Sequence, residues 1–447
     1  MWILDIRIAP PNQITKNIIT MKTIYKKGRT GLKGMALAVL ALLLLPPLFV
    51  NGQEFTKEMT NIKGASSIIR SWTNKIYMVS GLNNNVPFFA EINDVGITTD
   101  ILHLTKIASY VYDFEILNDT LYFCGTKWGV EGATAVMGYF CLTSFPSVQV
   151  YACTVPLMAS CQKLEVGHFN GTRHVVMTGN AILGTSHIVD ARDMGSDQWN
   201  FNIPYYTDEI DVYDDVALTD NYVVVSARDT ALKEGYLCLF DQPAANSSLM
   251  PQSNAQYLKF MHDVYGNILL EHCTADTIAF LTQYAANGYA TSILDVTNPV
   301  FSTERLFPVS TDIMTMDDIR YNIYARRADV LMQNLTAGAS EVLHVAFSPS
   351  TTVMGHQYYG ENLLSLDELT NGYFVAVGIA SSGSLGIYRC SFNSFPICST
   401  QSTRTVSLGG RYIVDSQLLP LPSVNIKVTA SCYSRSGSPM PITTICQ

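Results

Sequence analysis

The sequence contains few charged residues. Asp, Glu, Lys and Arg make up 15% of its 447 residues, whereas apolar residues make up 48%. A disordered chain has the opposite balance, so this composition predicts a folded protein. Residues 53–447 also contain no stretch with apolar positions at i, i+3, i+4 and i+7. The absence of this pattern argues against amphipathic helices and against β–α–β units.

The sequence also lacks the motifs of several enzyme classes. It has no HExxH, GxSxG, P-loop, EF-hand or GxGxxG pattern, so the mechanisms built on those motifs have no residues to act through. Basic character is missing too, because residues 53–447 contain 21 Lys and Arg against 36 Asp and Glu, a net charge of −15. An acidic surface disfavours nucleic acid and anionic lipid. We therefore expect neither as a partner, and no cofactor apart from a divalent cation such as calcium.

One long apolar run stands near the N-terminus. Residues 35–50 read MALAVLALLLLPPLFV, follow a stretch with five Lys and Arg, and precede the small, polar NGQ. This order is typical of a secretory signal peptide. A membrane anchor is the alternative, but crossing the hydrocarbon takes about 20 apolar residues, and Pro46 and Pro47 interrupt the run. We expect translation to start at Met21, residues 1–52 to be leader and signal, and the mature protein to be secreted, extracellular or periplasmic, with no membrane segment.

A short apolar strand recurs through the rest of the chain. Its eight copies start 44 to 55 residues apart. They are IYMVSG at Ile76, LYFCG at Leu121, VVMTG at Val175, VVVSA at Val223, IAFLT at Ile278, VLMQN at Val330, FVAVG at Phe374 and IKVTA at Ile426. The sequence contains 24 Tyr and 19 Phe, which favours strands. Repetition at one period indicates one structural unit repeated along the chain.

Each copy has similar neighbours. An alternating stretch and a tight Asn, Asp or Gly turn precede it, as in YVYDFEILNDT before Leu121, which predicts a hairpin. A third strand follows and often ends near a proline, which cannot donate a hydrogen bond to a sheet. GYFCLTSFP at 138–146 and GIYRCSFNSFP at 386–396 are two such strand ends. Four strands in about 50 residues predict the blade of a β-propeller.

The count of copies predicts an all-β propeller with eight four-stranded blades in one domain, residues 53–447. Seven blades is the alternative, if the weak copy around Val330 elaborates its neighbour. The last copy has three strands, so we expect the N-terminal segment after Gln53 to close it and to pair with residues 441–447. Two β-sandwiches would not keep one period throughout, and β-helix turns are about half as long or shorter. In architecture the chain resembles secreted bacterial β-propellers, although it lacks the Trp-Asp, kelch and Asp-box signatures of particular families.

Acidic residues recur in the first strand of the repeat, which lines the central channel of a propeller. They are Asp113, Glu115, Glu165, Asp214, Asp215, Glu271, Asp317, Asp318, Asp367, Glu368 and Asp415. Such carboxylates could hold a divalent cation, attract a basic partner or pair for glycoside chemistry. They could instead accept hydrogen bonds from backbone amides of neighbouring blades and bind no ligand. Their registers within the repeat differ, which favours this second interpretation.

All ten cysteines follow residue 52, where export would permit disulfides. Three pairs could each bridge neighbouring strands of one blade: Cys141 with Cys153, Cys390 with Cys398, and Cys432 with Cys446. Four others could be buried free thiols: Cys124, Cys161, Cys238 and Cys273.

A recognisable scaffold without a catalytic motif favours a non-enzymatic binding or scaffold module. Its ligand would be a protein, a glycan or a cation, and we expect the module to be a monomer. The alternative is a carbohydrate-active enzyme, a glycoside hydrolase or lyase that uses carboxylates at the channel mouth. A deep pocket with two carboxyl groups about 5 to 10 Å apart would indicate the enzyme. A shallow aromatic-rich or acidic face would indicate the binder.

The signal peptide gives the first testable prediction. N-terminal sequencing of the exported protein should find a first residue between about Asn51 and Glu54, because cleavage follows small residues after the apolar run. Recovery of a chain that begins at Met1 would contradict both the start site and the cleavage.

Overall fold

The computed structural model divides the chain into two units, Met1–Asn51 and Gly52–Gln447. The residues that it describes belong to the second unit: 55–73, 76–96, 98–182, 185–205, 211–242, 256–260, 263–297, 305–307, 312–322, 326–347, 352–359, 361–368, 373–391, 400–405, 407–408, 413–418, 424–436 and 438–439. The signal peptide and the start at Met21 lie outside these residues. Within them, no helix is long and apolar enough to span a membrane.

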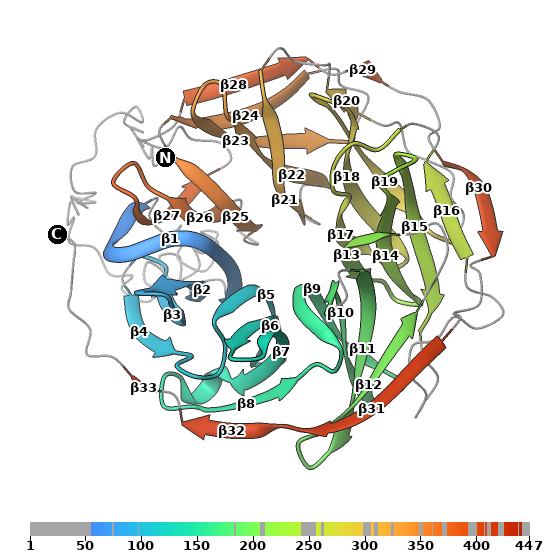
Figure 1. The fold of residues 1–447 in the computed structure, drawn as a ribbon. Coiled ribbons are helices and arrows are strands. Elements are labelled where there is room, and N and C mark those ends of the chain that lie inside the picture. The colour runs from blue at the N-terminus through green and yellow to red at the C-terminus, as the bar shows by residue number, and fades with distance from the viewer. Residues whose placement is uncertain are drawn as a thin grey trace, which may run out of the picture. The chain divides into compact units, whose positions relative to one another are not determined.

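Seven antiparallel blades of four strands each form a ring around a central channel (Figure 1). This is the β-propeller that the sequence predicts. Blade 1 consists of the second half of β1 (Phe55–Thr73) with β2 (Ile76–Asn83), β3 (Val86–Asn93) and β4 (Thr98–His103). Blade 2 consists of β5 (Tyr110–Leu117), β6 (Thr120–Gly129), β7 (Gly132–Cys141) and β8 (Gln149–Thr154). Blade 3 consists of β9 (Met158–Phe169), β10 (Thr172–Ala181), β11 (Ser186–Gly195) and β12 (Gln198–Tyr205). A short 3₁₀ helix, Leu142–Ser144, follows β7.

The remaining blades repeat the same order from an innermost to an outermost strand. Blades 4 and 5 consist of β13 (Val212–Leu218), β14 (Tyr222–Asp229), β15 (Glu234–Asp241) and β16 (Gln256–Phe260), and of β17 (Leu269–Thr274), β18 (Thr277–Ala285), β19 (Gly288–Asp295) and β20 (Arg305–Phe307). Blades 6 and 7 consist of β21 (Met314–Asn322), β22 (Arg327–Asn334), β23 (Ala339–Ala346) and β24 (Thr352–Tyr359), and of β25 (Asn362–Glu368), β26 (Tyr373–Ile379), β27 (Ser384–Ser391) and the first half of β1. The two sequence phrases that end in SFP begin in the third strands of blades 2 and 7, as predicted.

The chain after blade 7 runs around the outside of the ring as a belt. It adds an antiparallel fifth strand to blades 6, 5, 4, 3, 2 and 1 in that order (Figure 1). The belt strands are β28 (Thr400–Thr405), β29 (Ser407–Leu408), β30 (Ile413–Leu418), β31 (Val424–Ser431), β32 (Tyr433–Ser436) and β33 (Ser438–Pro439). Each belt strand covers an outer edge whose backbone groups would otherwise lack partners.

The eight-blade prediction is therefore wrong, and the seven-blade alternative is correct. The copy that misled the count is IKVTA at Ile426, because it forms belt strand β31 on the outside of blade 3. The copy around Val330, suspected as the weak one, is the second strand of blade 6. Period and β-propensity do not separate a blade strand from an edge strand. Burial does, since VVMTG is buried throughout whereas Lys427, Thr429 and Ser431 in β31 are exposed.

The N-terminal strand closes the ring, although in a different blade from the one predicted. The first half of β1 pairs with β27 of blade 7, from Phe55 opposite Arg389 to Met59 opposite Leu385. Its second half pairs with β2 of blade 1. The segment 413–418, expected to begin an eighth blade, instead lies against the outer strand of blade 4. Residues 441–447, the expected partner of the N-terminal segment, lie outside the described residues.

The hydrophobic core is divided into seven layers, one between each pair of neighbouring blades. In the layer between blades 6 and 7, for example, Leu331 and Val342 meet Phe374 and Tyr388. Each middle strand is covered on both faces, so it reads as a continuous apolar run in the sequence. This double burial produces the repeated motif from which the propeller could be predicted.

One disulfide lies within the described residues, and it differs from all three expected pairs. Cys153 in β8 bonds Cys432 between β31 and β32, with a Cα–Cα distance of 4.5 Å. The bond fastens the belt to blade 2. The spacing of cysteines could not predict it, because the two residues are 279 positions apart in the sequence. Cys141 has a free thiol, as do the four cysteines expected to be buried. Cys398 and Cys446 lie outside the described residues, so the pair of Cys390 with Cys398 stays a prediction.

We predict that the belt disulfide carries a measurable share of the stability. Replacing Cys432 with Ser should lower the free energy of unfolding by about 2–4 kcal/mol, because the bond closes a long loop in the unfolded chain. Denaturant titration of the full chain would measure the loss. The matched control is Cys141→Ser at an exposed free thiol, which should change stability by less than about 0.5 kcal/mol. Equal midpoints for the two variants would contradict the prediction.

Candidate functional site: the central channel and the mouth face

Three aspartates connect the innermost strands of neighbouring blades. In each, one carboxylate oxygen accepts the N–H of the next residue, and the other accepts an N–H from the innermost strand of the following blade. The contacts are Asp113 with Phe114 at 3.0 Å and Leu164 at 3.2 Å, Asp215 with Val216 at 2.9 Å and Leu270 at 3.0 Å, and Asp318 with Ile319 at 3.0 Å and Leu366 at 3.1 Å. Asp367 makes the same kind of bridge from blade 7 to Ser71 of blade 1 at 2.5 Å.

A bulge in the innermost strand accompanies these bridges, and glycine makes room for it. The register shifts between Val111 and Asp113 in blade 2. Opposite this bulge, a Cβ on Gly125 would lie 2.0 Å from the carbonyl oxygen of Tyr110. Gly378 stands against the corresponding bulge of blade 7 at a similar distance. Several copies of the repeat therefore end in glycine because a side chain there would collide with the bulged backbone that carries the channel residues.

Two arginines contact carboxylates of a neighbouring blade. Arg70 of β1 contacts Glu115 through Nε at 2.6 Å and Asp113 through Nη2 at 3.0 Å. Arg320 of β21 contacts Glu271 of blade 5 at 3.0 Å through Nη1. Neither the two arginines nor Lys163 were predicted from the sequence, because only the acidic residues of the innermost strands stood out as a repeated pattern. Their position in those same strands was the signal that could have identified them.

The remaining predicted acids have different surroundings. Asp214 forms a bidentate ion pair with Arg228, at 2.6 and 2.8 Å. Glu368 lies beside Asp329 of blade 6, where burial and the neighbouring charge raise its pKa. Asp415 lies in belt strand β30, away from the innermost strands. Within the described residues, no three His, Cys, Asp or Glu side chains are placed to hold a metal ion.

Burial governs the protonation of several channel carboxyls. It raises the pKa of Glu271 to about 8, of Asp317 to about 7 and of Asp215 to about 6. Burial likewise raises the pKa of Glu165 well above its usual range, reinforced by Glu115 and Glu271. Asp318 differs: burial opposes ionisation there, but Arg320, Arg70 and Lys163 together hold its pKa below the usual value. The channel thus contains both neutral and ionised acids at neutral pH.

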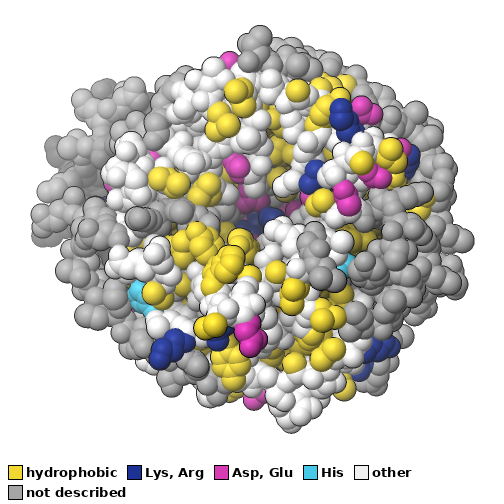
Figure 2. Space-filling view, in the orientation of Figure 1, with side chains coloured by type: hydrophobic (Ala, Val, Ile, Leu, Met, Phe, Trp, Pro, Cys, Tyr) yellow, Lys and Arg dark blue, Asp and Glu magenta, His cyan; other side chains and the backbone are white. Residues whose placement is uncertain are grey.

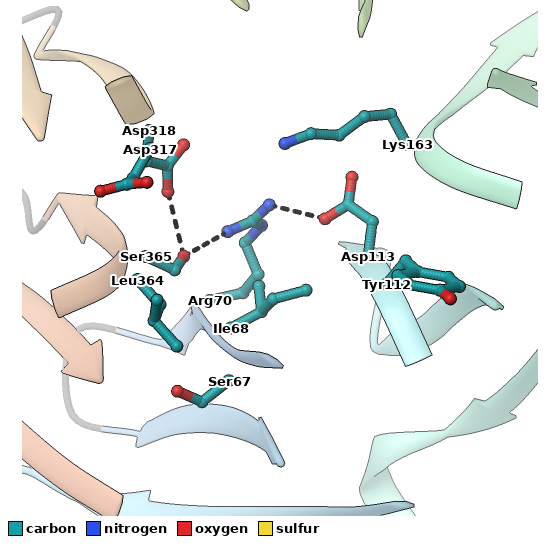
Figure 3. A pocket seen from close by; sticks show the side chains of 10 residues that line it. All are labelled: Ser67, Ile68, Arg70, Tyr112, Asp113, Lys163, Asp317, Asp318, Leu364 and Ser365. Carbon is teal, nitrogen blue, oxygen red and sulfur yellow. Dashed lines mark hydrogen bonds and ion pairs between the residues drawn. The ribbon is translucent and has the colours of Figure 1, made fainter. Parts of the chain in front are cut away.

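A cavity of about 290 Å³ lies inside the channel (Figure 3). Its lining residues are Ser67, Ile68, Arg70, Tyr112, Asp113, Lys163, Asp317, Asp318, Leu364 and Ser365. Those from β5, β9, β21 and β25 lie near the middle of their strands. The cavity is therefore about midway along the channel, measured from the side of the ring at which the chain enters the innermost strands.

We call that side of the ring the mouth face. Antiparallel order places there both the turns between second and third strands and the connections from one blade to the next. Within the described residues, eleven large apolar side chains are exposed, and eight of them belong to mouth-face loops. The eight are Trp128, Val130, Leu157, Ile182, Leu232, Tyr265, Ile313 and Leu335. Val95 and Met194 lie in turns of the opposite face, and Met354 lies in an outer strand.

These eight side chains occur in four neighbouring pairs. Trp128 lies at the end of β6, and Val130 lies in the turn that follows it in blade 2. Backbone hydrogen bonds connect Ile182 to Leu157 at 3.0 Å and Leu335 to Ile313 at 2.8 Å. The ammonium of Lys233, next to Leu232, lies 4.5 Å from the ring centre of Tyr265. Paired loops that are bonded to each other hold apolar groups in fixed positions, which scattered surface residues do not.

The space-filling view shows how the channel meets solvent. On the face that it displays, hydrophobic side chains gather around a central hollow, and Lys, Arg, Asp and Glu side chains lie in its depth (Figure 2). The charged channel is therefore open to small molecules from that face.

Comparisons with known proteins give a weak likeness in structure and none in sequence. No protein-family model matches the chain, and no curated protein sequence matches it. Prolyl oligopeptidase B from Galerina marginata, in its apo structure, aligns with a TM-score of 0.35 and 10% identity over 77% of this chain. A mutant of the same protein bound to a 25mer macrocyclization substrate aligns with a TM-score of 0.33 and 10% identity over 78%. The chain spans about half the length of these proteins, 52% of each.

We predict that Glu271 makes stability fall with rising pH. Its carboxyl keeps its proton up to about pH 8 in the folded state, whereas the unfolded chain releases it near 4.5. The stabilisation is therefore present below about pH 4.5 and is lost as pH rises to 8, with a slope of up to about 1.4 kcal/mol per pH unit. Glu271→Gln, which stays neutral, should flatten the curve between pH 5 and 8 in denaturant titrations.

The matched control is Glu131→Gln in an exposed turn, which should leave the pH dependence as in the wild type. A wild-type curve with the same slope as that of Glu271→Gln would show that Glu271 is ionised in the folded state.

Proposed function

We propose that this chain is an exported, non-enzymatic binding module that docks a partner protein on its mouth face. The observation that carries the proposal is the gathering of exposed apolar side chains in bonded pairs on one side of the ring. A patch of this kind supports an interaction surface, because exposed apolar groups gain free energy when a partner removes them from water. Trp128, which is 63% exposed, has the chemistry of a residue that contributes most to binding energy.

The partner's chemistry follows from the loops. Apolar tips alternate there with charged residues such as Lys127, Glu131 and Lys233. Mixed apolar and charged surface of this kind is typical of interfaces between proteins that fold separately. Lipid is a poorer candidate, because the chain has a net negative charge and anionic lipid would repel it.

The channel supports binding better than glycoside chemistry. A glycosidase needs two carboxyls free to exchange a proton with substrate. Asp113 and Asp318 each have both oxygens engaged by backbone N–H groups, and Glu115 and Glu271 contact arginines. These contacts hold the blades together. Export is supported by the disulfide, since such bonds persist mainly in oxidising compartments, and by the basic and apolar leader.

Site-specific photo-cross-linking would test the docking face. A photoreactive phenylalanine analogue at Leu157, Leu232 or Ile313 should form cross-links to one partner protein in the native host. The matched control is Met194 on the opposite face. Its side chain is 51% exposed, almost the same as that of Leu157 on the mouth face, which is 50% exposed. Ile182→Ser with Leu335→Ser should then weaken the isolated complex at least tenfold.

Three outcomes would contradict the proposal: cross-links that form equally from Met194, no cross-link from any mouth-face position, or unchanged affinity in the double variant. A cross-linked product that consists of two copies of this chain would replace the foreign partner with a homodimer, which light scattering would reveal as a doubled mass.

A further inference from the structure

We propose that the channel cavity is a binding site for an uncharged, hydroxyl-rich small molecule, of which a single sugar ring is the model. The inference is independent of the docking role, because it rests on the hydrogen-bonding groups and charges inside the channel.

Lys163 supplies hydrogen-bond donors that the protein leaves unused. Its side chain extends from β9 into the cavity (Figure 3), and among the described residues it makes no hydrogen bond or ion pair. Burial opposes its charge, but the nearby carboxylates of Asp215, Asp113 and Asp318 together raise its pKa, so the ammonium stays protonated. Three N–H donors therefore face a space in which no protein acceptor reaches them.

Arg70 contributes one more donor beside Lys163. Of its five N–H groups, four are already directed to Glu115, Asp113, Ser365 and the carbonyl oxygen of Ile69. One N–H on Nη2 remains. The guanidinium is held rigidly by the other four bonds, so this donor has a fixed direction.

The carboxylate oxygens near these donors are already engaged. Those of Asp318 and Asp113 are occupied by backbone amides, Ser365 and Arg70. The carboxyl of Asp317 lies beyond Asp318 as seen from Lys163 and Arg70 (Figure 3), and its unpartnered Oδ2 is buried. The donors of Lys163 and Arg70 that face the cavity therefore remain unused. The oxygen of a hydroxyl group accepts such hydrogen bonds without carrying a charge.

The charge in the lining excludes strongly ionic ligands. Two cations, Arg70 and Lys163, are interleaved with three carboxyls, Asp113, Asp317 and Asp318. An anion that approached Lys163 would meet Asp113 and Asp318, and a cation that approached Asp318 would meet Arg70 and Lys163. Ile68 and Leu364 add apolar wall against which the C–H groups of a sugar ring could pack.

Titration calorimetry with the full chain would test the site. The probes are glucose, galactose, mannose and N-acetylglucosamine, compared with sodium sulfate, sodium acetate and calcium chloride at equal ionic strength. At least one sugar should bind more tightly than every salt. Lys163→Met keeps the stem and removes the donors, and it should weaken that binding about 10- to 100-fold, the usual effect of losing a hydrogen bond to a charged group.

The matched control is Lys427→Met, an exposed lysine on belt strand β31, which should bind as the wild type does. Leu364→Phe is the second test variant: it fills part of the cavity that Leu364 lines and should also weaken the sugar, even if Lys163→Met fails to fold. Thermal melting of each variant separates lost binding from lost structure.

The proposal is overturned if no sugar binds the wild type, if a salt binds more tightly than every sugar, or if binding survives both Lys163→Met and Leu364→Phe. None of these results bears on the cross-linking of the mouth face, so the two proposals can fail separately.

Discussion

The ring depends on one strand that belongs to two sheets. A β-sheet edge presents unpaired N–H and C=O groups, and a ring of separate blades would leave its first and last members without a covalent connection. β1 solves this by pairing with β27 through its first half and with β2 through its second half. The side chains follow the backbone, because Ile69 and Tyr77 of blade 1 share a hydrophobic layer with Val375 and Leu385 of blade 7. This seam supplies the one interblade layer that neighbours in sequence cannot form, the layer between the first and the last blade.

The same strand carries the central cation of the channel. Arg70 lies in the second half of β1 and reaches Asp113 and Glu115 of blade 2 and Ser365 of blade 7. Buried charges are costly to desolvate, and a partner on each side offsets that cost only when the geometry is fixed. The aspartate bridges between innermost strands provide this fixed geometry. Ring closure therefore fixes the positions of the channel side chains. Their contacts between blades stabilise the closed ring in return. This reciprocity explains why so many ionisable groups line a channel that has no metal-binding arrangement among the described residues.

The propeller could be predicted because double-sided burial leaves a continuous apolar run in every blade, and runs such as LYFCG and VVMTG were visible as a repeat. The blade number could not be settled in the same way, since the belt strand at Ile426 copies the β-propensity of a blade strand and differs from it only in burial. The disulfide from Cys153 to Cys432 spans 279 residues, and local spacing favours partners near in sequence. In the channel, acids were identified by composition, but their roles depend on Arg70, Arg320 and Lys163, which lie on other strands. Which channel residues contact each other depends on how the ring closes, and the order of residues along the sequence does not indicate this.

The belt also determines where a ligand can bind. Propellers and other sheet proteins can recruit partners by adding a strand to an open edge. In blades 1 to 6 the outer edge is already occupied by β28 to β33, and the inner edges meet across a channel filled with charged side chains. Strand addition to these six blades would require the belt to be displaced, and the disulfide at Cys432 resists that at blade 2. The surfaces that remain are the outer edge of blade 7, the two faces of the ring and the channel itself. Among the described residues, the apolar pairs held by backbone hydrogen bonds lie on the mouth face, and the cavity in the channel keeps unused donors. Because the belt covers the outer edges of blades 1 to 6, a ligand or partner protein is recognised there by the loops and the channel.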